Sequence, residues 1–388
     1  MNDEASVSFI PMNLILDSYA NKHTSEIRKW KEIKKGFTHF REGDVGIAKI
    51  TPCFENRKSV VFQHLESGYG AGTTELHVLR PISELFLSNY LIWFVKTEDF
   101  ITNGVNCFTG AVGQQRVGKN DIEETYFPLP PLSEQRRIVS VVESAFALID
   151  EIETNKISLT QLIKQAKSKI LDLAIRGKLV PQDPNDEPEG VLLEKIKNEQ
   201  KTKKTTVDNL HYPFDVPKGW VWCKLEEICE QITDGTHRTP NYKENGIPFL
   251  RVTDITESNE SKKFISQEEH NELIKRCNPE KGDVLLSKNG TIGVAKVVDW
   301  DYDFSIFVSL CLLKPKKIIS NKYLTFYLNS DDALKQMQSR GKTVTITNLH
   351  LEEVRQLEIP LPTIAEQHRI VQKIETIFQT LDSIQNNL

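Results

Sequence analysis

Two glycine-rich stretches carry residue types that could bind a phosphate group, and each lacks part of the required pattern. The stretch GQQRVGKN (residues 113–120) has the glycine and lysine spacing of a nucleotide-binding loop, but Asn120 stands where a Ser or Thr would bind Mg²⁺. The stretch GYGAG (residues 68–72) lacks the spacing of a dinucleotide site and a following helix, so we expect an ordinary turn there. Neither stretch predicts a nucleotide site.

Possible metal ligands are equally incomplete. Asp17, Glu32 and Lys34 could imitate the carboxylates and lysine of a Mg²⁺-dependent nuclease, but a solvated loop is the simpler interpretation in a chain with 27% charged residues. The nine histidines and six cysteines show no metal-ligand spacing. The sequence therefore predicts a non-catalytic protein that holds no metal and no cofactor of its own.

Polar and basic loops instead favour binding to nucleic acid. The net charge is −5, but acidic residues crowd the helices and the linker, and local patches set the field at a groove. The stretch TDGTHRTPNY (residues 233–242) groups side chains suited to phosphates and base edges, although an ordinary charged surface would look much the same. The candidate DNA-binding residues are Lys22, Arg28, Lys49, Gln114, Gln115, Arg116, Thr236, His237, Arg238, Thr239, Arg251, Lys288, Asn289, Thr345, Thr347 and Asn348.

A twelve-residue stretch occurs twice, as PLPPLSEQRRIV (residues 128–139) and PLPTIAEQHRIV (residues 360–371). Over the longer stretches 128–152 and 360–384, 12 of 25 positions are identical. An offset of 232 residues is far longer than the unit of a solenoid, so the repeat indicates two related domains in one chain.

A helical pattern with a coiled-coil seam follows each copy. Apolar residues recur there at alternating spacings of three and four, which predicts a helix of about 65 Å from Ser133 to Gly177 and a second of about 36 Å ending at Leu388. Thr363 with Glu366 fits a capping box, and Ser133 is the expected cap of the first helix. The predicted helix interface contains Ile138, Val142, Ile149, Ile163, Ile170, Ile370, Ile374, Ile377, Leu381 and Ile384.

The two helices have two possible partners. An antiparallel pair within the chain is favoured because both helices come from the same repeat, and an intermolecular coiled coil is the alternative. Since the second helix is the shorter, we expect the seam from about Leu159 to Gly177 to lack a partner within the chain.

The segment before each copy of the repeat alternates short strand patterns with helix patterns. Strands are expected in GIPFLRV, GDVLLSK, TIGVAKVV and FSIFVSLCLLKP and a helix in NKYLTFYLNSDDALKQMQS, with fainter echoes in the first half of the chain. The fold predicted is α+β, with two mixed α/β domains separated by two long antiparallel coiled-coil helices. The expected parts are a first domain (1–132) that looks truncated at its start, a central helix (133–178), a linker with a short helix (179–216), a second domain (217–362) and a C-terminal helix (363–388).

Composition fits a soluble protein of 388 residues. Hydrophobic residues make up 39% of the chain, and no run approaches the roughly 18 apolar residues of a membrane span. The acidic start MNDEASVSF is unlike a signal peptide, and the six cysteines form no C-x-x-C pair. We therefore expect a cytoplasmic protein without a membrane partner.

Together these motifs resemble the DNA sequence-specificity subunit of type I restriction-modification enzymes. The resemblance rests on the duplicated P-L-P-x-x-x-E-Q-x-R-I-V and on GWVWCKLEEI, ITDGTHRTPNY, GDVLLSKNGTIG, AKSKILDLAIRGKLVPQDPNDEP, KKGFTHFREGDVGIAKITPC and GAGTTELHVLRP. It covers essentially the whole chain. It implies two target-recognition domains that each read one half of a bipartite DNA site, with the helices setting the spacer between the halves.

The resemblance also implies partners. Two methyltransferase subunits would dock on the helices and domains, and two restriction subunits, which are ATP-dependent motors, would complete the complex on double-stranded DNA. S-adenosylmethionine, ATP and Mg²⁺ would then be bound by those subunits and not by this chain. The alternative is a truncated or orphan subunit that acts as an interaction scaffold, with only its second domain reading DNA.

Overall fold

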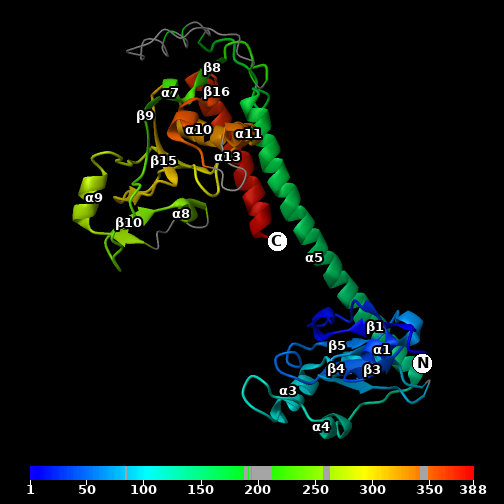
Figure 1. Cartoon of the computed structure of the whole chain (residues 1–388). Helices are drawn as coiled ribbons and strands as arrows, with labels where there is room; N and C mark the ends of the chain where they lie inside the picture. The colour runs from blue at the N-terminus through cyan, green and yellow to red at the C-terminus, as the bar shows by residue number, and fades with distance from the viewer. Residues whose placement is uncertain are drawn as a thin grey trace. The chain divides into compact units, whose positions relative to one another are not determined.

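The computed structural model divides the chain into two compact units, Met1–Thr154 (unit 1) and Asn155–Leu388 (unit 2) (Figure 1). The residues that it describes are 1–83, 85–187, 191, 194, 212, 214–256, 263–340 and 348–388. The short helix expected in the linker falls mainly outside them. No helix in these ranges is long and apolar enough to cross a bilayer.

Unit 1 contains two small sheets. The first has the strand order β2-β1-β6-β3 and the second the order β5-β4-β7. Their strands are β1 (Ser6–Ile10), β2 (Glu26–Lys29), β3 (Thr38–Arg41), β4 (Val45–Ala48), β5 (Ser59–Val61), β6 (Tyr69–Gly72) and β7 (Leu76–Leu79). The helices of the unit are η1 (Met12–Leu14), α1 (Trp30–Ile33), η2 (Glu66–Gly68), α2 (Ser88–Val95), α3 (Glu98–Asn106) and α4 (Lys119–Glu123).

Unit 2 contains three sheets, with strand orders β13-β12-β15-β9, β11-β10-β14 and β16-β8. Their strands are β8 (Val221–Lys224), β9 (Cys229–Asp234), β10 (Ile247–Leu250), β11 (Phe264–Ile265), β12 (Val284–Ser287), β13 (Ala295–Val297), β14 (Ser305–Ile306), β15 (Leu310–Pro315) and β16 (Glu358–Leu361). The helices are α7 (Leu225–Ile228), α8 (Val252–Thr256), α9 (Gln267–Leu273), α10 (Asn321–Leu328), α11 (Asp331–Arg340), α12 (Leu351–Arg355) and α13 (Ile364–Asn386), and α5 (Leu132–Ile175) is shared between the units.

The two units repeat one framework, as the echoes between the halves of the sequence predict. In unit 1, β1 pairs antiparallel with β2 and parallel with β6, and in unit 2, β10 pairs antiparallel with β11 and parallel with β14. Likewise β4 lies between β5 and β7, and β12 lies between β13 and β15, all antiparallel. Unit 2 adds β9 on the outer edge of β15 and the pair β8–β16.

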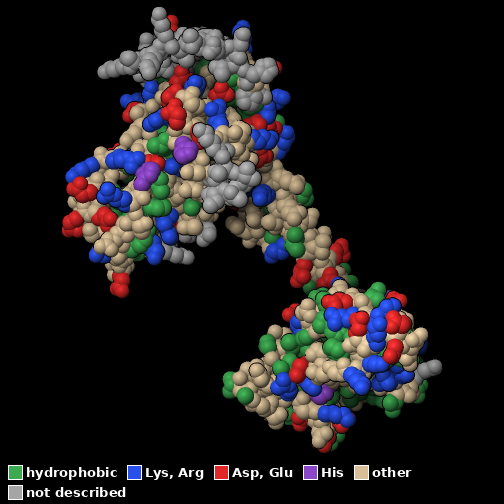
Figure 2. Space-filling model, viewed as in Figure 1, with side chains coloured by type: hydrophobic (Ala, Val, Ile, Leu, Met, Phe, Trp, Pro, Cys, Tyr) green, Lys and Arg blue, Asp and Glu red, His purple; other side chains and the backbone are tan. Residues whose placement is uncertain are grey.

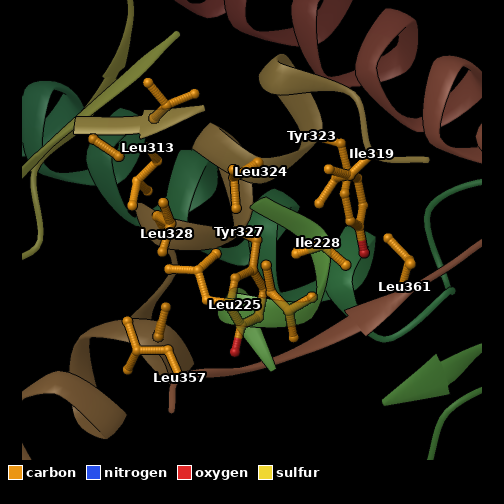
Figure 3. Close-up of a cluster of buried hydrophobic side chains, with 14 of the residues drawn as sticks. Leu225, Ile228, Leu313, Ile319, Tyr323, Leu324, Tyr327, Leu328, Leu357 and Leu361 are labelled. Atoms are coloured by element: carbon orange, nitrogen blue, oxygen red, sulfur yellow. The ribbon is translucent and has the colours of Figure 1, made fainter. Parts of the chain in front are cut away.

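The core of unit 2 lies where α7, α10, α12 and the strands β15 and β16 meet (Figure 3). Tyr323 and Tyr327 on α10 are fully buried against Leu225 and Ile228 on α7. The Tyr323 hydroxyl donates to the carbonyl of Pro360 at 2.7 Å, which ties the core to the strand that carries the second copy of the repeat.

The two long helices pair antiparallel, and the pairing covers a part of α5 that we expected to lack a partner. Lys167 on α5 pairs with Asp382 on α13, and the Lys156 ammonium donates to the carbonyl of Leu388. The seam from Leu159 to Gly177 therefore has its partner within the chain, and the expectation that it lacks one is wrong. The reason is that the last turn of α5 and the first turn of α13 pack on the same core, so pairing starts at the C-terminal end of α5.

The predicted seam residues accordingly differ in burial, depending on their position along the two helices. Ile163, Ile370 and Ile374 are buried, and Ile170, Ile377 and Leu381 are half-buried near the pairing of α5 with α13. Val142 is half-buried, whereas Ile138 and Ile149 are exposed on the first half of α5 and Ile384 is exposed near the end of α13. The described residues show no coiled-coil partner for the first half of α5.

Several local expectations need correction. Residues 69–72 of GYGAG form the strand β6 and not a turn, where Gly70 and Gly72 let the Phe40 ring and the carbonyl of Ile10 approach the backbone, and Gly68 ends the short helix η2. The stretch FSIFVSLCLLKP forms two strands, β14 and β15, in different sheets, and the helix expected after it is divided into α10 and α11. At the second division the Ser330 hydroxyl accepts from the amide of Ala333 and so caps α11.

The predicted helix caps are only partly correct. The Thr363 hydroxyl accepts from the amide of Glu366 at 3.3 Å, as a helix cap should. The Glu366 carboxylate, however, binds other residues instead of reaching back to complete a capping box. Helix α5 begins at Leu132, so Ser133 lies within its first turn and is not the cap.

Candidate nucleic-acid interface

Asp234 lies at the centre of a charged cluster at the end of β9. Its buried carboxylate pairs with Lys288 at 3.3 Å, with the ring of His237 at 3.2 Å and with Arg276 at 2.5 Å. Burial works against ionisation of Asp234, but Lys288 and His237 keep its pKa below the ordinary value. The cluster therefore holds the loop that follows β9 against the end of β12.

The loop after β9 presents the predicted polar residues at the surface. A Cβ at Gly235 would collide with the carbonyl oxygen of Ile306, so only glycine allows this close approach. Thr236 then forms a bridge with Phe307, and its hydroxyl accepts from the amide of Arg238 at 3.2 Å. His237, Arg238 and Thr239 are exposed beyond this anchor. Figure 2 shows Lys, Arg and His side chains among acidic ones on the face that carries β9, β10 and β15.

Lys288 does not lie where the sequence prediction placed it. The side chain was expected to contact DNA, but it is buried and pairs with Asp234. Its backbone is equally fixed, since its amide donates to Ser309 and its carbonyl accepts from Leu349. In this structure Lys288 is a positioning residue for the loop and is not part of the accessible surface.

Two equivalent positions follow the central strands of the two units. Asn289 after β12 forms an antiparallel bridge with Asn348, and Ile50 after β4 forms the same bridge with Arg116. The preceding lysines are also equivalent, because the carbonyl of Lys49 accepts from Val117 just as that of Lys288 accepts from Leu349. Arg116 and Asn348 thus occupy matching places and offer different chemistry.

Arg116 is held by a carboxylate in unit 1. Its guanidinium donates to both oxygens of Glu75 at 2.8 and 3.0 Å and to the carbonyl of Gln114 at 2.8 Å. These hydrogen bonds hold the pKa of the Glu75 carboxyl below its ordinary value. Gln114 is exposed, Gln115 and Lys49 are half-exposed beside it, and the carbonyl of Gln115 accepts from the amide of Thr51.

The other predicted residues are not brought into these two clusters by any contact among the described residues. Lys22 pairs with Asp150 on α5 at 3.0 Å, and Arg28 stacks on the Phe9 ring at 3.8 Å on the other sheet of unit 1. Arg251 follows β10 and pairs with Asp254 at 3.3 Å. Thr345 and Thr347 lie outside the described residues.

The sequence prediction missed the residues that hold the candidate surface in place. Asp234 was read only as part of the TDGTHRTPNY stretch and Glu75 only as part of GAGTTELHVLRP, and Arg276 lies in no motif. An acidic residue beside a basic loop is a sequence signal for Asp234, but no sequence feature marks the roles of the other two. Among the described residues no group of three or more His, Cys, Asp or Glu side chains could hold a metal ion.

The repeated residues after each domain join the domain to its helix in the same way. The side-chain amide of Gln135 donates to the carbonyls of Leu85 and Pro130, and the side-chain amide of Gln367 donates to those of Ile318 and Pro362, all at 2.9 to 3.1 Å. Both glutamines are buried, and the repeat therefore encodes a domain-to-helix joint.

A second contact of each joint lies further along the helix. Glu143 accepts from Asn89 on α2 at 2.8 Å, and Glu375 accepts from Lys322 on α10 at 2.6 Å. The equivalent aromatic pairs are Trp93 with Phe146 and Phe326 with Phe378.

Comparison with known proteins shows which family this chain matches. Residues 11–161 and 217–388 match the family model described as the type I restriction modification DNA specificity domain. The chain belongs to this family.

Relatives in the family agree over almost the whole chain. The EcoAI specificity subunit of Escherichia coli, from a type I restriction enzyme, is 31% identical over 445 residues, which cover 99% of this chain and 75% of the relative. The EcoEI specificity subunit of Escherichia coli is 32% identical over 469 residues, covering 100% and 76%.

A solved structure shows the same fold. The HsdS subunit from Thermoanaerobacter tengcongensis aligns with a TM-score of 0.60 at 21% identity, covering 100% of this chain and 86% of that one. The predicted α+β architecture with two long helices is thereby confirmed.

Proposed function

We propose that this chain is the non-catalytic DNA-reading subunit of a type I restriction-modification complex. Each of its two domains reads one half of a bipartite site, and the helices set the spacer between the halves. The observation that carries this proposal is the pair of matching, half-buried positions, Arg116 in unit 1 and Asn348 in unit 2. The same arrangement of strands with different polar side chains at matching positions suits the reading of two different half-sites.

The chemistry of these positions suits base edges. Arginine makes bidentate contacts to guanine, and asparagine makes them to adenine, each worth about 1 to 3 kcal/mol of discrimination against the wrong base. Asn348 is half-buried, and its Oδ1 atom is buried without a hydrogen-bond partner among the described residues, so the side chain would turn outward to contact a base. Exposed His237 and Arg238, in the loop after β9, would contact phosphates and fix the register.

In this proposal, partner subunits carry out the methylation and restriction reactions. We place two methyltransferase subunits on the helices, where Ile149, Ile152 and Leu148 leave an apolar surface exposed on the first half of α5. Two restriction subunits would complete the complex in the cytoplasm. S-adenosylmethionine, ATP and Mg²⁺ belong to these partners in the proposal.

The test is a map of methylated adenines in a genome without other methylases, after co-expression of this chain with a methyltransferase subunit. We expect a bipartite asymmetric motif. Arg116→Ala should relax or abolish recognition in one half only, and Asn348→Ala in the other half only. Lys169→Ala, which removes an exposed charge on α5, is the control and should leave the motif unchanged. If both variants alter the same half, or neither alters the motif, the proposal is wrong.

A further inference from the structure

Unit 1 contains an apolar groove of about 520 Å³ beside the edge strand β7. Four of its apolar lining residues are Leu91 and Phe94 on α2, Phe127 and Leu129. Leu129 is 59% exposed, and the neighbouring Tyr126 is 97% exposed. Such a patch on a folded unit indicates a surface that another chain segment covers.

The equivalent surface of unit 2 is fully covered. By the repeat, Leu91, Phe94, Phe127 and Leu129 correspond to residues that are all at most 1% exposed, namely Leu324, Tyr327, Ile359 and Leu361. The cover is the segment β8-α7-β9, whose Leu225 and Ile228 point into the cluster drawn in Figure 3.

The same segment also completes the sheets of unit 2. Strand β9 pairs with the outer edge of β15, and β8 pairs with β16. In unit 1 the equivalent of β15 is β7, which has no second strand partner among the described residues. Residues 126–129, the equivalents of β16, form no strand. Among the described residues, unit 1 therefore offers one free strand edge, that of β7, and a segment without strand pairing, residues 126–129, beside the groove.

A carboxylate marks where the segment's tryptophan would lie. In unit 2 the Glu366 carboxylate accepts from the indole N–H of Trp220 at 2.8 Å. Its repeat equivalent in unit 1 is Glu134, which is half-exposed and has an ion pair with Arg137 at 3.8 Å. Glu366 is buried, and this burial raises its pKa even though the hydrogen bonds of Trp220 and Gln182 oppose the rise.

We propose that the groove of unit 1 is a docking site for a polypeptide segment of the same design as residues 217–235. Such a segment would add one strand to β7 and one to residues 126–129. It would place a Leu-x-x-Ile pair over Leu91 and Phe94 and donate its tryptophan N–H to Glu134. The groove is thus a site for strand addition by a Trp-containing strand–helix–strand segment.

The test uses the full chain and a fluorescein-labelled peptide of residues 217–235 in reducing buffer, followed by fluorescence anisotropy. We expect saturable binding of one peptide per chain. Leu129→Glu should weaken binding roughly tenfold or more, because it places a charge in the apolar contact. Ile157→Glu is the matched control, since Ile157 is 63% exposed on α5 outside the groove, and it should leave binding unchanged.

A double-mutant cycle separates the proposed contact from general adhesion of an apolar peptide. Glu134→Gln in the chain and Trp220→Phe in the peptide should each weaken binding, and the two together should cost no more than either alone. Additive losses, or no loss, would overturn the assignment of the tryptophan.

A fusion covers the case of a peptide that cannot fold in solution. Residues 217–235 placed before Met1 through a flexible linker should raise the melting temperature of the chain, and the same fusion with Trp220→Ala in the added copy should raise it less. The proposal fails if neither the free nor the fused segment acts through Leu129. It also fails if the chain forms dimers that Leu129→Glu abolishes, because a second copy would then be the occupant.

Discussion

At the scale of single residues, the candidate surface depends on buried charges that the sequence does not reveal. Composition and turn chemistry indicate that the loop of residues 235–239 is polar and accessible, and the structure agrees. The buried position of Lys288 could not be predicted, because its partner Asp234 is brought to it only by the pairing of β9 with β15 and of β15 with β12. A lysine in a sequence looks the same whether it faces solvent or a buried carboxylate.

The Asp234 cluster gives a prediction about pH. The pKa of Asp234 is below its ordinary value in the folded chain, so its stabilising contribution is complete above about pH 4 and is lost as the pH falls further. We expect Asp234→Asn to lower the free energy of unfolding at neutral pH, and the difference from the wild type to shrink below about pH 4. Urea unfolding at a series of pH values, followed by circular dichroism, measures this difference.

The control for this prediction is an exposed acid of the same unit. Asp301→Asn removes a carboxylate that is 81% exposed and pairs with Lys281, so it should change stability little at any pH. A difference between Asp234→Asn and the wild type that stays constant, or grows, as the pH falls would contradict the assigned role.

At the scale of elements, the period of the apolar residues predicts the helices well but not their contacts. Both long helices were predicted to within a few residues, because the seam and the prolines before each helix are local signals. Which stretch of α5 meets α13 depends on where the two helix ends pack, and Leu171 and Ala174 in that contact lie off the predicted seam. The division of the strand pattern at residues 307–309 is likewise a tertiary effect, since β14 joins β10 and β15 joins β12.

The helix pairing gives a prediction about stability. Ile374 on α13 is fully buried, and truncation to alanine should cost about 2 to 5 kcal/mol, because a cavity is left in the core of unit 2. Ile384 lies on the same helix but is 43% exposed, so Ile384→Ala should change stability by no more than about 0.5 kcal/mol. Hydrogen exchange of the amides of α10 and β15, measured by mass spectrometry, should be faster in the first variant alone. Equal exchange in the two variants would mean that α13 contributes little to this core.

At the scale of the whole molecule, the same arrangement of strands and helices occurs twice, and the two copies carry different polar residues at matching positions. The sequence predicts this duplication because the repeat and the strand patterns recur in the same order. The repeat's offset of 232 residues also relates Arg116 to Asn348, and the bridges to Ile50 and Asn289 show that the two residues occupy equivalent places in the fold. The proposed reading of two half-sites therefore rests on the comparison of the two sites and not on either site alone.

Two readers on one chain should bind cooperatively through effective concentration. We expect a duplex with both half-sites to bind the chain, with its methyltransferase partner, about 10² to 10⁴ times more tightly than a duplex with one half scrambled. Arg116→Ala should weaken binding to the full site, and it should have no further effect once the half-site read by unit 1 is scrambled. Affinities measured at several salt concentrations separate this effect from phosphate contacts, because the slope with salt depends on the number of phosphates contacted and not on the base sequence. If scrambling one half leaves the affinity unchanged at every salt concentration, only one unit reads DNA, and the chain acts as a reader of a single half-site on a scaffold.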